Sequence, residues 1–385
     1  MILSVIIVSY NVKFFLEQCL SSLKKAIDSS QVLRGQTEVF IIDNFSDDGT
    51  ADFLTPLFPE FRFLENKENI GFAKANNQAV SFCSGEFLLF LNPDTILAED
   101  SLDICVSFMG SNTDAGAVGP KMIDGAGNYL KESKRGFPGT SASFFKMIGL
   151  ARLFPHTKLF SAYYLGHLNE ETSQVVDVLT GAFMMIRKSV FEITGGFDEQ
   201  FFMYAEDIDL SYQISKVGYQ NYYLPQSAII HFKGESTRKD VKYVKDFYSA
   251  MELFIKKHFS GNHTSIHLYL LKLGIHLRRA LAYFQLPLKR SADKSSKSLL
   301  VFIKGEPNEK KYWKLRLEDK KISTTENEKD ATEMLYCQGS ARSWKSIIEE
   351  ITLSKRRLTY KFHGEGTHSA VGSYSSRRQG DIIEK

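Results

Sequence analysis

The chain has 385 residues, enough for one catalytic domain and a smaller second unit, because domains commonly hold about 100 to 200 residues. Its hydrophobic content of 43% and charged content of 24% are those of a globular protein and exclude a mainly disordered chain. The formal net charge of +3 is too small to indicate a nucleic-acid partner, and we expect none. The four cysteines show neither metal-ligand spacing nor a disulfide framework, so we expect reduced thiols in a cytoplasmic protein.

The N-terminal sequence MILSVIIVSYNV is interpreted as a buried strand. It has no basic n-region and no small-residue cleavage site, so it is not typical of a signal peptide. No apolar run in the chain reaches the length of a membrane span. These features favour a cytoplasmic location.

Strand and helix patterns alternate from residue 3 to residue 91. Short apolar runs predict strands at 3–8, 38–42, 61–64 and 86–91. Apolar residues at helical spacing predict helices at 14–27, 51–57 and 73–81. This alternation predicts an α/β fold with an open, mostly parallel sheet and helices on both faces.

Polar residues follow the predicted strands. Asp43, Asn69 and Asp94 all lie just beyond a strand. The carboxyl ends of parallel strands meet at one edge of a sheet, and ligands of open α/β sheets bind there. We therefore expect these side chains to gather around a binding site.

Residues 195–210, GGFDEQFFMYAEDIDL, place several carboxylates, among them Asp198, Glu206, Asp207 and Asp209, close to aromatic side chains. A carboxylate in such surroundings loses hydration that only a cation, a hydrogen-bond donor or a raised pKa can replace. A group of this kind is a candidate general base. The alternative is a Gly-Gly turn followed by an ordinary helix whose first turn tolerates Glu206 and Asp207. These residues alone leave both interpretations open.

Seven motifs, taken in order, carry a resemblance to a known family. They are VSYN at 8–11, IDNFSDDGT at 42–50, NIGFAKANNQA at 69–79, FLNPDT at 90–95, LTGAFMMIRK at 179–188, GGFDEQFFMYAEDIDL at 195–210 and HFKGES at 231–236. Together they resemble the inverting family 2 glycosyltransferases, and within these the rhamnosyltransferase-like branch. The resemblance covers residues 1–240 and implies a GT-A catalytic domain, a nucleotide-sugar donor, a divalent cation and single-displacement transfer with inversion.

The resemblance implies a metal site at Asp94, which matches the metal-binding end of the family's Asp-x-Asp element. A divalent cation, Mg²⁺ or Mn²⁺, would offset the negative charge that develops as the diphosphate leaves. The first position of this element is Asn92, a departure that removes one charge from the site. His231 matches a family histidine and is the second candidate ligand. From the residues alone, a turn Asp after Pro93 and a structural histidine remain open alternatives.

The donor is expected to contact residues of the first half of the chain. In the resemblance, Asp43 matches the position that hydrogen-bonds the nucleobase, and a carboxylate can accept from the imide N–H of a pyrimidine. Gly71 lets the backbone approach a ligand closely. Turn formation and helix capping explain these residues nearly as well. The full donor-binding set is Ser9, Asn11, Asp43, Asn69, Gly71, Asn76, Asn92 and Asp94.

Inversion requires one base that takes the proton of an acceptor hydroxyl while its oxygen attacks the anomeric carbon. Asp207 matches the family's base in its Glu-Asp pair. Glu206 is the alternative, because adjacent residues at a helix start point in different directions. Asp209 is expected to cap the helix or to form a structural ion pair.

The rest of the chain is divided into three further segments. Residues 241–290 are predicted to hold helices at 244–259 and 266–286, the second of them basic and amphipathic. That helix either contacts an anionic membrane surface or packs on the catalytic core. A polar linker at 291–298 leads to a small α/β appendage at 299–385, whose last dozen residues are expected to be frayed.

Three functions compete for this sequence. The first is transfer of a hexosyl or deoxyhexosyl group from a dTDP- or UDP-sugar to a glycan, in particular a lipid-linked glycan of surface polysaccharide synthesis. The second is a nucleotidyltransferase, whose Gly-rich N-terminal loop is replaced here by SVIIVSYN. The third is a glycan-binding or regulatory protein on an inactive glycosyltransferase scaffold. The joint presence of Asp43, Asp94, Asp207 and His231 favours the first.

Overall fold

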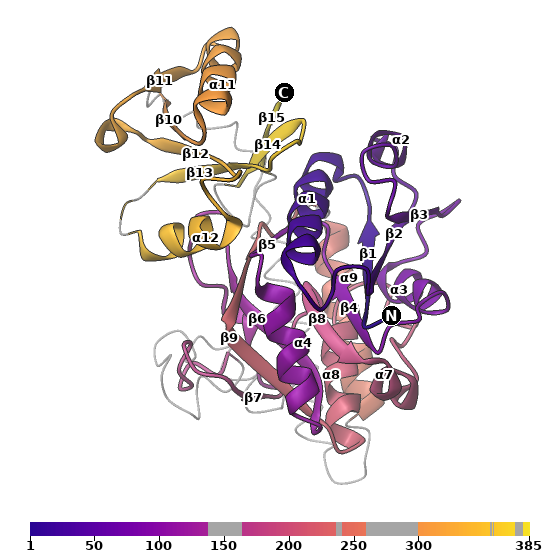
Figure 1. Cartoon of the computed structure of the whole chain (residues 1–385). Coiled ribbons are helices and arrows are strands. Elements are labelled where there is room, and N and C mark those ends of the chain that lie inside the picture. The colour runs from indigo at the N-terminus through magenta and orange to yellow at the C-terminus, as the bar shows by residue number, and fades with distance from the viewer. Residues whose placement is uncertain (138–163, 236–240, 259–298, 355, 357, 374–379) are drawn as a thin grey trace.

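The computed structural model describes residues 1–137, 164–235, 241–258, 299–354, 356, 358–373 and 380–385. Within these residues the chain forms a nine-stranded sheet and a separate six-stranded sheet (Figure 1). The predicted helix at 266–286 and the linker at 291–298 lie outside the described residues, so the membrane contact assigned to that helix stays a prediction. All four cysteines are free and buried.

The first half of the large sheet is parallel. Its strands β1 (Leu3–Ser9), β2 (Thr37–Asp43), β3 (Arg62–Glu65) and β4 (Phe87–Leu91) lie in the order β3-β2-β1-β4. Alternate residues of β1 point to opposite faces, so Val5 and Ile7 enter one apolar core while Ile6 and Val8 enter another. Burial on both faces explains the unbroken apolar run of the sequence.

The second half of the large sheet is mixed. It contains β5 (Thr95–Leu97), β6 (Ala115–Ile123), β7 (Gln174–Val176), β8 (Phe183–Arg187) and β9 (Gln220–His231). β8 is antiparallel to β4 and β6, β5 and β7 are antiparallel to β9, and β6 is parallel to β9. The open α/β sheet is confirmed, and its uninterrupted parallel order is confined to the first four strands. The pairing of Thr95 with His231 brings the segment after β4 beside the end of β9.

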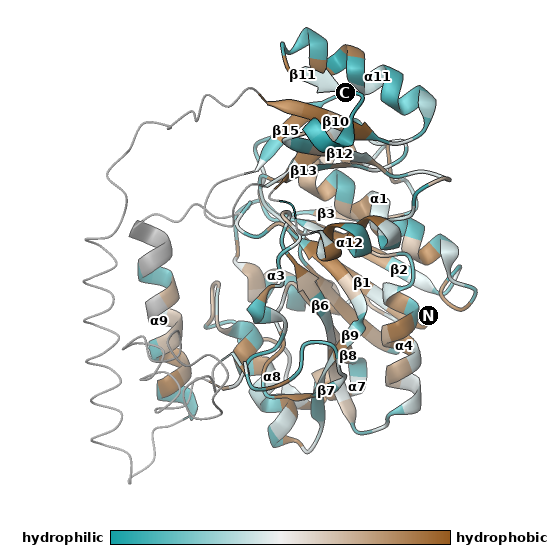
Figure 2. Ribbon diagram, turned by 90° about the vertical axis from the view of Figure 1, so that its left-hand side faces the viewer, coloured by the Kyte–Doolittle hydropathy of each residue, from teal (hydrophilic) through white to brown (hydrophobic). Residues whose placement is uncertain are grey.

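Helices cover both faces of the large sheet. The helices are α1 (Lys13–Ser29), α2 (Thr50–Leu54), α3 (Phe72–Val80), α4 (Ser101–Ser111), α7 (Lys188–Thr194), α8 (Glu206–Lys216) and α9 (Val241–His258). α1 and α4 pack on one face, and α3, α7 and α8 on the other. In Figure 2 the apolar strands lie between them. Among the described helices, none combines the length and the apolar character that crossing a membrane requires.

The appendage forms a second α/β unit. Its elements are β10 (Leu300–Lys304), α11 (Pro307–Asp319), β11 (Ser323–Thr325), η2 (Glu328–Asp330), β12 (Glu333–Cys337), α12 (Trp344–Leu353), β13 (Thr359–His363), β14 (Ser369–Gly372) and β15 (Asp381–Glu384). The strand order is β11-β10-β12-β13-β14-β15, with the first four parallel. The expectation of a frayed end is wrong for residues 381–384, because β15 pairs in register with β14.

The two sheets share an apolar core and a polar contact. α12 packs between the small sheet and the β5–β9 edge of the large sheet, where Trp344 meets Phe232 and its neighbours in one cluster (Figure 1). On α1, the buried Gln18 amide donates to Thr367 and Ser369. The buried Glu17 carboxylate accepts from the Ser369 hydroxyl at 2.6 Å. These contacts fasten the appendage to the larger α/β unit.

Candidate active site

A pocket of about 440 Å³ lies at the carboxyl ends of β1 and β4. Its walls come from the loop after β4, the end of β9, the segment before β8 and the start of α8. Six of the residues expected from the sequence line it: Asn69, Asn92, Asp94, Glu206, Asp207 and His231. A pocket is therefore present at the edge of the sheet where ligands were expected. The candidate metal ligands and the candidate bases both line it.

Asp94 and His231 face each other across the paired strands β5 and β9. Oδ1 of Asp94 lies 3.4 Å from Nε2 of His231, and both side chains are largely buried. Burial alone would raise the pKa of Asp94, but the charge and hydrogen bond of His231 and nearby backbone N–H groups lower it. Asp94 is thus held as a carboxylate, the form that binds a cation.

This pair fits a divalent cation that also binds a diphosphate. Within the described ranges no three His, Cys, Asp or Glu side chains converge as a metal site. Mg²⁺ commonly takes one or two carboxylates and completes its shell with water and substrate phosphates. One carboxylate and one imidazole at the pocket wall suit that mode. Asn92 adds no charge, and its side-chain nitrogen lies 3.4 Å from Nε2 of His231.

Asp207 is held by a buried ion pair. Its Oδ2 accepts a 2.6 Å hydrogen bond from the guanidinium of Arg135 and a 3.2 Å bond from the backbone N–H of Gly181. Only 13% of the Asp207 side chain and 10% of the Arg135 side chain are exposed. A second bond from Arg135 to the carbonyl of Leu179 fixes the guanidinium. These contacts fix the orientation of the Asp207 carboxylate.

Glu206 lies next to Asp207 but in different surroundings. It is buried, and Oε2 has no hydrogen-bond partner among the described residues. Burial and the neighbouring charge of Asp207 raise the pKa of Glu206 well above its ordinary value. The surroundings of the two carboxyl groups therefore differ: burial favours the neutral form of Glu206, whereas Asp207 is held in an ion pair with Arg135.

Strained backbone surrounds the pocket. Tyr204 and Ala205, just before α8, have φ values of 73° and 65°, and Lys233 after β9 has 65°. Asn11 after β1 and Phe45 after β2 have 53° and 73°. A non-glycine residue in this left-handed region costs on the order of 1 kcal/mol or more and persists only where neighbours hold it. Such strain is typical of functional sites, and here it aims the start of α8 at the pocket.

The sequence of the chain is similar to that of known proteins. Residues 4–194 match the model of glycosyl transferase family 2. The chain contains a glycosyl transferase family 2 domain. It is 28% identical over 272 residues to an N-acetylglucosaminyl-diphospho-decaprenol L-rhamnosyltransferase of Mycobacterium tuberculosis, covering 68% of this chain and 86% of that protein. It is 32% identical over 179 residues to rhamnosyltransferase WbbL of Escherichia coli, covering 44% of this chain and 63% of that protein.

A solved structure agrees with this assignment at the level of the fold. GalNAc-T7, determined with UDP, GalNAc and Mn²⁺, aligns with a TM-score of 0.51 at 14% identity, over 84% of this chain and 55% of that one. The family 2 domain thus has the GT-A fold expected from the motifs. The comparisons identify an enzyme, a glycosyltransferase similar to rhamnosyltransferases.

Several residues that were expected to bind the nucleotide-sugar donor do not line the pocket. Their side chains form hydrogen bonds within the neighbouring loops or are buried beneath them. Asp43 is buried and accepts hydrogen bonds from the backbone and hydroxyl of Ser46. The side chain of Asn11 accepts a hydrogen bond from the backbone N–H of Asp47. This bond joins the loops after β1 and β2. Ser9 is fully buried, and its hydroxyl has no partner among the described residues. These three residues shape the loops that border the pocket.

The turn before α3 is built in the same way. Asn69 accepts from Asn44 at 3.0 Å and from the backbone of Gly71 at 3.0 Å. Gly71 has a φ of 85°, and a β-carbon there would come within 2.7 Å of the Phe202 ring. Asn76 is buried and bonds to the carbonyl of Phe72. Asn69 alone of the expected residues in this turn lines the pocket.

Other pocket residues escaped the sequence interpretation. Arg135 is the most important of them, and it lies in KESKRGFP, a segment without periodic pattern. Lys233 forms a 2.6 Å ion pair with Glu132 at the pocket wall. Lys233 stands within the motif HFKGES, so that motif was the signal that could have identified it. Asp209 is structural, as expected, because it pairs with Lys257 and His258 of α9.

Proposed function

We propose that this protein is an inverting glycosyltransferase that moves a deoxyhexosyl or hexosyl group from a dTDP- or UDP-sugar to a hydroxyl of a lipid-linked glycan in surface polysaccharide synthesis. One observation carries the proposal. The pair Asp94–His231 and the pair Asp207–Arg135 line the same pocket of about 440 Å³. The first pair suits the diphosphate of a donor, and the second suits a base that acts on an acceptor hydroxyl.

The chemistry follows from the state of the two carboxylates. Asp207, ionised, takes the proton of the acceptor hydroxyl while its oxygen bonds to the anomeric carbon. The bond from that carbon to the diphosphate breaks on the opposite side, so the configuration inverts and the nucleoside diphosphate leaves. Arg135 acts as a positioning residue, because it holds the Asp207 carboxylate in one orientation. Burial raises the pKa of Glu206 and favours its neutral form, so Asp207 is the better candidate for the base.

Asp94 and His231 are the residues that would hold a divalent cation. When bound, the cation supplies positive charge to the leaving diphosphate. The Mn²⁺ in the structure of GalNAc-T7 supports this part of the proposal, although only the fold is shared.

The proposed acceptor is drawn from a relative, and the proposed location from the sequence. The name of the mycobacterial relative specifies a diphospho-decaprenol, a lipid-linked acceptor. A cytoplasmic enzyme with such an acceptor would meet it at the inner membrane face, through the basic segment 266–290. Sedimentation with anionic vesicles at low and high salt tests this. Binding lost at high salt is expected, and a chain that never sediments with vesicles contradicts the membrane contact.

Release of nucleoside diphosphate from a panel of nucleotide sugars tests the reaction and its base together. With a lipid-linked glycan extract and Mn²⁺, one donor is expected to turn over. Asp207→Asn is expected to lower the rate by about 10² to 10⁴ while donor binding is kept, because a general base contributes that much. Glu206→Gln is the matched control and is expected to stay active. A dead Glu206→Gln with an active Asp207→Asn reverses the assignment, and no release with any donor favours a binding protein.

Removal of the metal ligands tests the cation site. Asp94→Ala is expected to abolish turnover and the dependence of donor binding on Mn²⁺, because it removes the one carboxylate of the pair. His231→Ala is expected to weaken both less severely, because a neutral imidazole supplies a ligand nitrogen but no negative charge. Donor titrations with Mn²⁺ and with a chelator measure this. Equal donor affinity of the unaltered protein in both conditions gives Asp94 a structural role.

A further inference from the structure

The pocket of the family 2 domain is lined by more acidic than basic side chains. Its acidic side chains are Asp94, Glu132, Glu206 and Asp207. Among the described residues that line it, the lysine and arginine side chains are those of Lys233 and Arg135. A nucleotide sugar brings further negative charge on its diphosphate, which has to be met by positive charge. Arg135 already holds Asp207 and the carbonyl of Leu179, so Lys233 is the side chain that remains for this task.

The loop after β9 holds Lys233 between two anchored ends. At its start, the backbone N–H of Phe232 donates to the carbonyl of Asp94 at 3.0 Å. At its end, the buried Glu235 carboxylate accepts a 2.7 Å hydrogen bond from the backbone N–H of Gly380 in the C-terminal unit. Lys233 itself has a φ of 65°. A non-glycine residue keeps this left-handed conformation only where its neighbours hold it, so the two anchors fix the backbone that presents the lysine.

Lys233 lies between the two charged pairs of the pocket. It follows the candidate metal ligand His231 by two residues, and its Nζ donates a 2.6 Å hydrogen bond to Glu132. Burial alone would raise the pKa of Glu132, but Lys233 and, more weakly, Arg135 lower it, so the base pair Asp207–Arg135 is close to this carboxyl group. In a nucleotide sugar, the β-phosphate joins the anomeric carbon. It therefore has to lie between the metal ligands and the base, beside the ammonium of Lys233.

The ion pair of Lys233 and Glu132 is open to water. The two side chains are 31% and 35% exposed, and Glu132 is the one ion-pair partner of Lys233 in the part of the chain that the structure describes. An ion pair with this exposure contributes little to stability. Lys233 can therefore leave the carboxylate when a phosphate enters the pocket.

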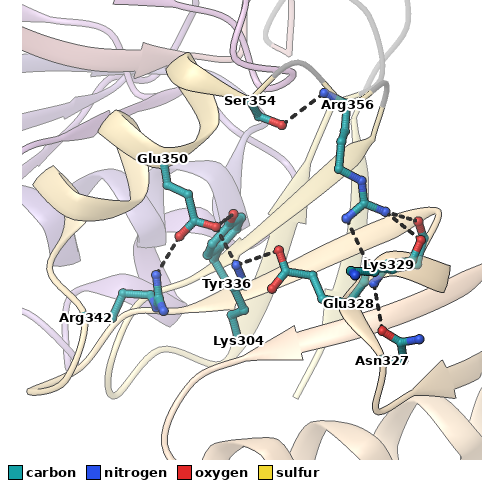
Figure 3. Close-up of polar contacts among 10 residues, drawn as sticks. Lys304, Asn327, Glu328, Lys329, Tyr336, Arg342, Glu350, Ser354 and Arg356 are labelled. Atoms are coloured by element: carbon teal, nitrogen blue, oxygen red, sulfur yellow. Dashed lines mark hydrogen bonds and ion pairs between the residues drawn. The ribbon is translucent and has the colours of Figure 1, made fainter.

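A lysine with a structural role has different surroundings in the same chain. Lys304 of the small sheet is mostly buried and donates to Glu328 at 2.9 Å and to Glu350 at 2.5 Å (Figure 3). Arg342 and Tyr336 also donate to Glu350, so this carboxylate is held from several sides. Lys304 is fixed by such a network, whereas Lys233 is held by a single carboxylate.

We propose that Lys233 is a donor-binding residue that exchanges Glu132 for the β-phosphate of the nucleotide sugar. This role rests on the proposed function, because it requires a diphosphate donor. The ammonium forms a charge-assisted hydrogen bond to a phosphate oxygen and offsets the negative charge that develops as the bond to the sugar breaks. Glu132 keeps the lysine at the pocket before the donor binds, and it competes with the donor for the ammonium.

Titration calorimetry of the full chain with UDP and with dTDP, in the presence of Mn²⁺, tests this role. The nucleotide that binds more tightly is then compared with its monophosphate. Lys233→Gln is expected to weaken the diphosphate about tenfold and the monophosphate far less, because one charged hydrogen bond to the β-phosphate is lost. Lys233→Arg keeps the charge and is expected to restore most of the affinity. Lys131→Gln is the matched control and is expected to change neither, because it removes the same charge next to Glu132 but outside the pocket.

Glu132→Gln tests the exchange of partners by the direction of its effect. It removes the competitor for the ammonium and is expected to tighten diphosphate binding about two- to fivefold, the range of a weak, exposed ion pair. A pair that only supports the loop predicts the opposite direction. Weaker diphosphate binding by Glu132→Gln therefore overturns the exchange.

Contrary results separate this role from the proposed function. When neither UDP nor dTDP binds to the unaltered chain, the donor site and the role of Lys233 are both wrong. When one of them binds and Lys233→Gln binds it equally well, the role of Lys233 is wrong and the proposed function stands. Equal weakening of the monophosphate and the diphosphate removes Lys233 from the β-phosphate. A Lys233→Arg variant as weak as Lys233→Gln gives the lysine a structural role.

Discussion

Asp207 and Glu206 are neighbours in the sequence, yet they lie in different electrostatic surroundings. Asp207 accepts hydrogen bonds from the guanidinium of Arg135 and from the backbone N–H of Gly181. Glu206 is buried and lies beside the negative charge of Asp207, and both effects raise its pKa. When environments separate two carboxylates in this way, one serves as a base and the other stays neutral. The proposed mechanism uses this separation.

The raised pKa of Glu206 leads to a prediction about stability and pH. A carboxyl whose pKa is raised on folding adds stability below its unfolded value, and that stability is lost as pH rises through the folded value. The contribution of Glu206 to the free energy of unfolding should therefore fall between about pH 5 and pH 8 in the unaltered protein. Glu206→Gln, permanently neutral, should fall less over this range. Chemical denaturation at both pH values measures the difference, and parallel curves would contradict the buried neutral state.

At the scale of single residues, the sequence identified which side chains belong to the site, but not which side chains contact each other. The motifs identified Asp94, His231, Glu206 and Asp207, and the structure brings these four to one pocket. Nothing in the sequence indicated Arg135, because its partner is 72 residues away. An ion pair between distant segments depends on topology, which residue spacing does not encode.

Elements with strong apolar patterns were predicted almost at their observed bounds. β1, α1, β2 and β4 differ from the predicted ranges by a residue or two. Weak patterns failed. α11 is rich in lysine and buries only Trp313 and Leu317, so its apolar stripe was too sparse to recognise. β15 is mostly exposed and exists through its pairing with β14.

Elements also determine how the site is presented. α8 begins after two left-handed residues, Tyr204 and Ala205, and its first turn carries Glu206, Asp207 and Asp209. Gly71 has no side chain, so Phe202 can pack closely against it. The carbonyl of Phe202 accepts a hydrogen bond from the backbone N–H of Phe72. The loop before α8 is thus fastened to the start of α3. The strain of this turn is offset by contacts that lie outside α8 itself.

At the scale of the molecule, the appendage and the catalytic half form one packed body. Phe232, the residue after His231, has its ring centroid 5.1 Å from that of Phe15 on α1 and 5.7 Å from that of Phe362 in the small sheet. Glu99 accepts hydrogen bonds from the backbone of Trp344 and Lys345 at the start of α12. The strand end that carries His231 is therefore supported by the C-terminal unit, although no motif of that unit suggested such a role.

Removal of the appendage should consequently destabilise the catalytic half. A chain that ends at residue 298 exposes Phe15, Ile96 and Phe232, which the full chain buries in the cluster shared with Trp344 and Phe362. The full chain is expected to unfold in one transition, and the shortened chain at a lower midpoint with weaker Mn²⁺-dependent donor binding.

A single substitution tests the same cluster. Phe362→Ala in the full chain removes one ring of this cluster and should lower the free energy of unfolding by about 3 to 5 kcal/mol, typical of a buried phenylalanine. Thermal unfolding and donor titration measure both effects. A shortened chain that unfolds at the same midpoint and binds donor equally well would show that the two units are independent.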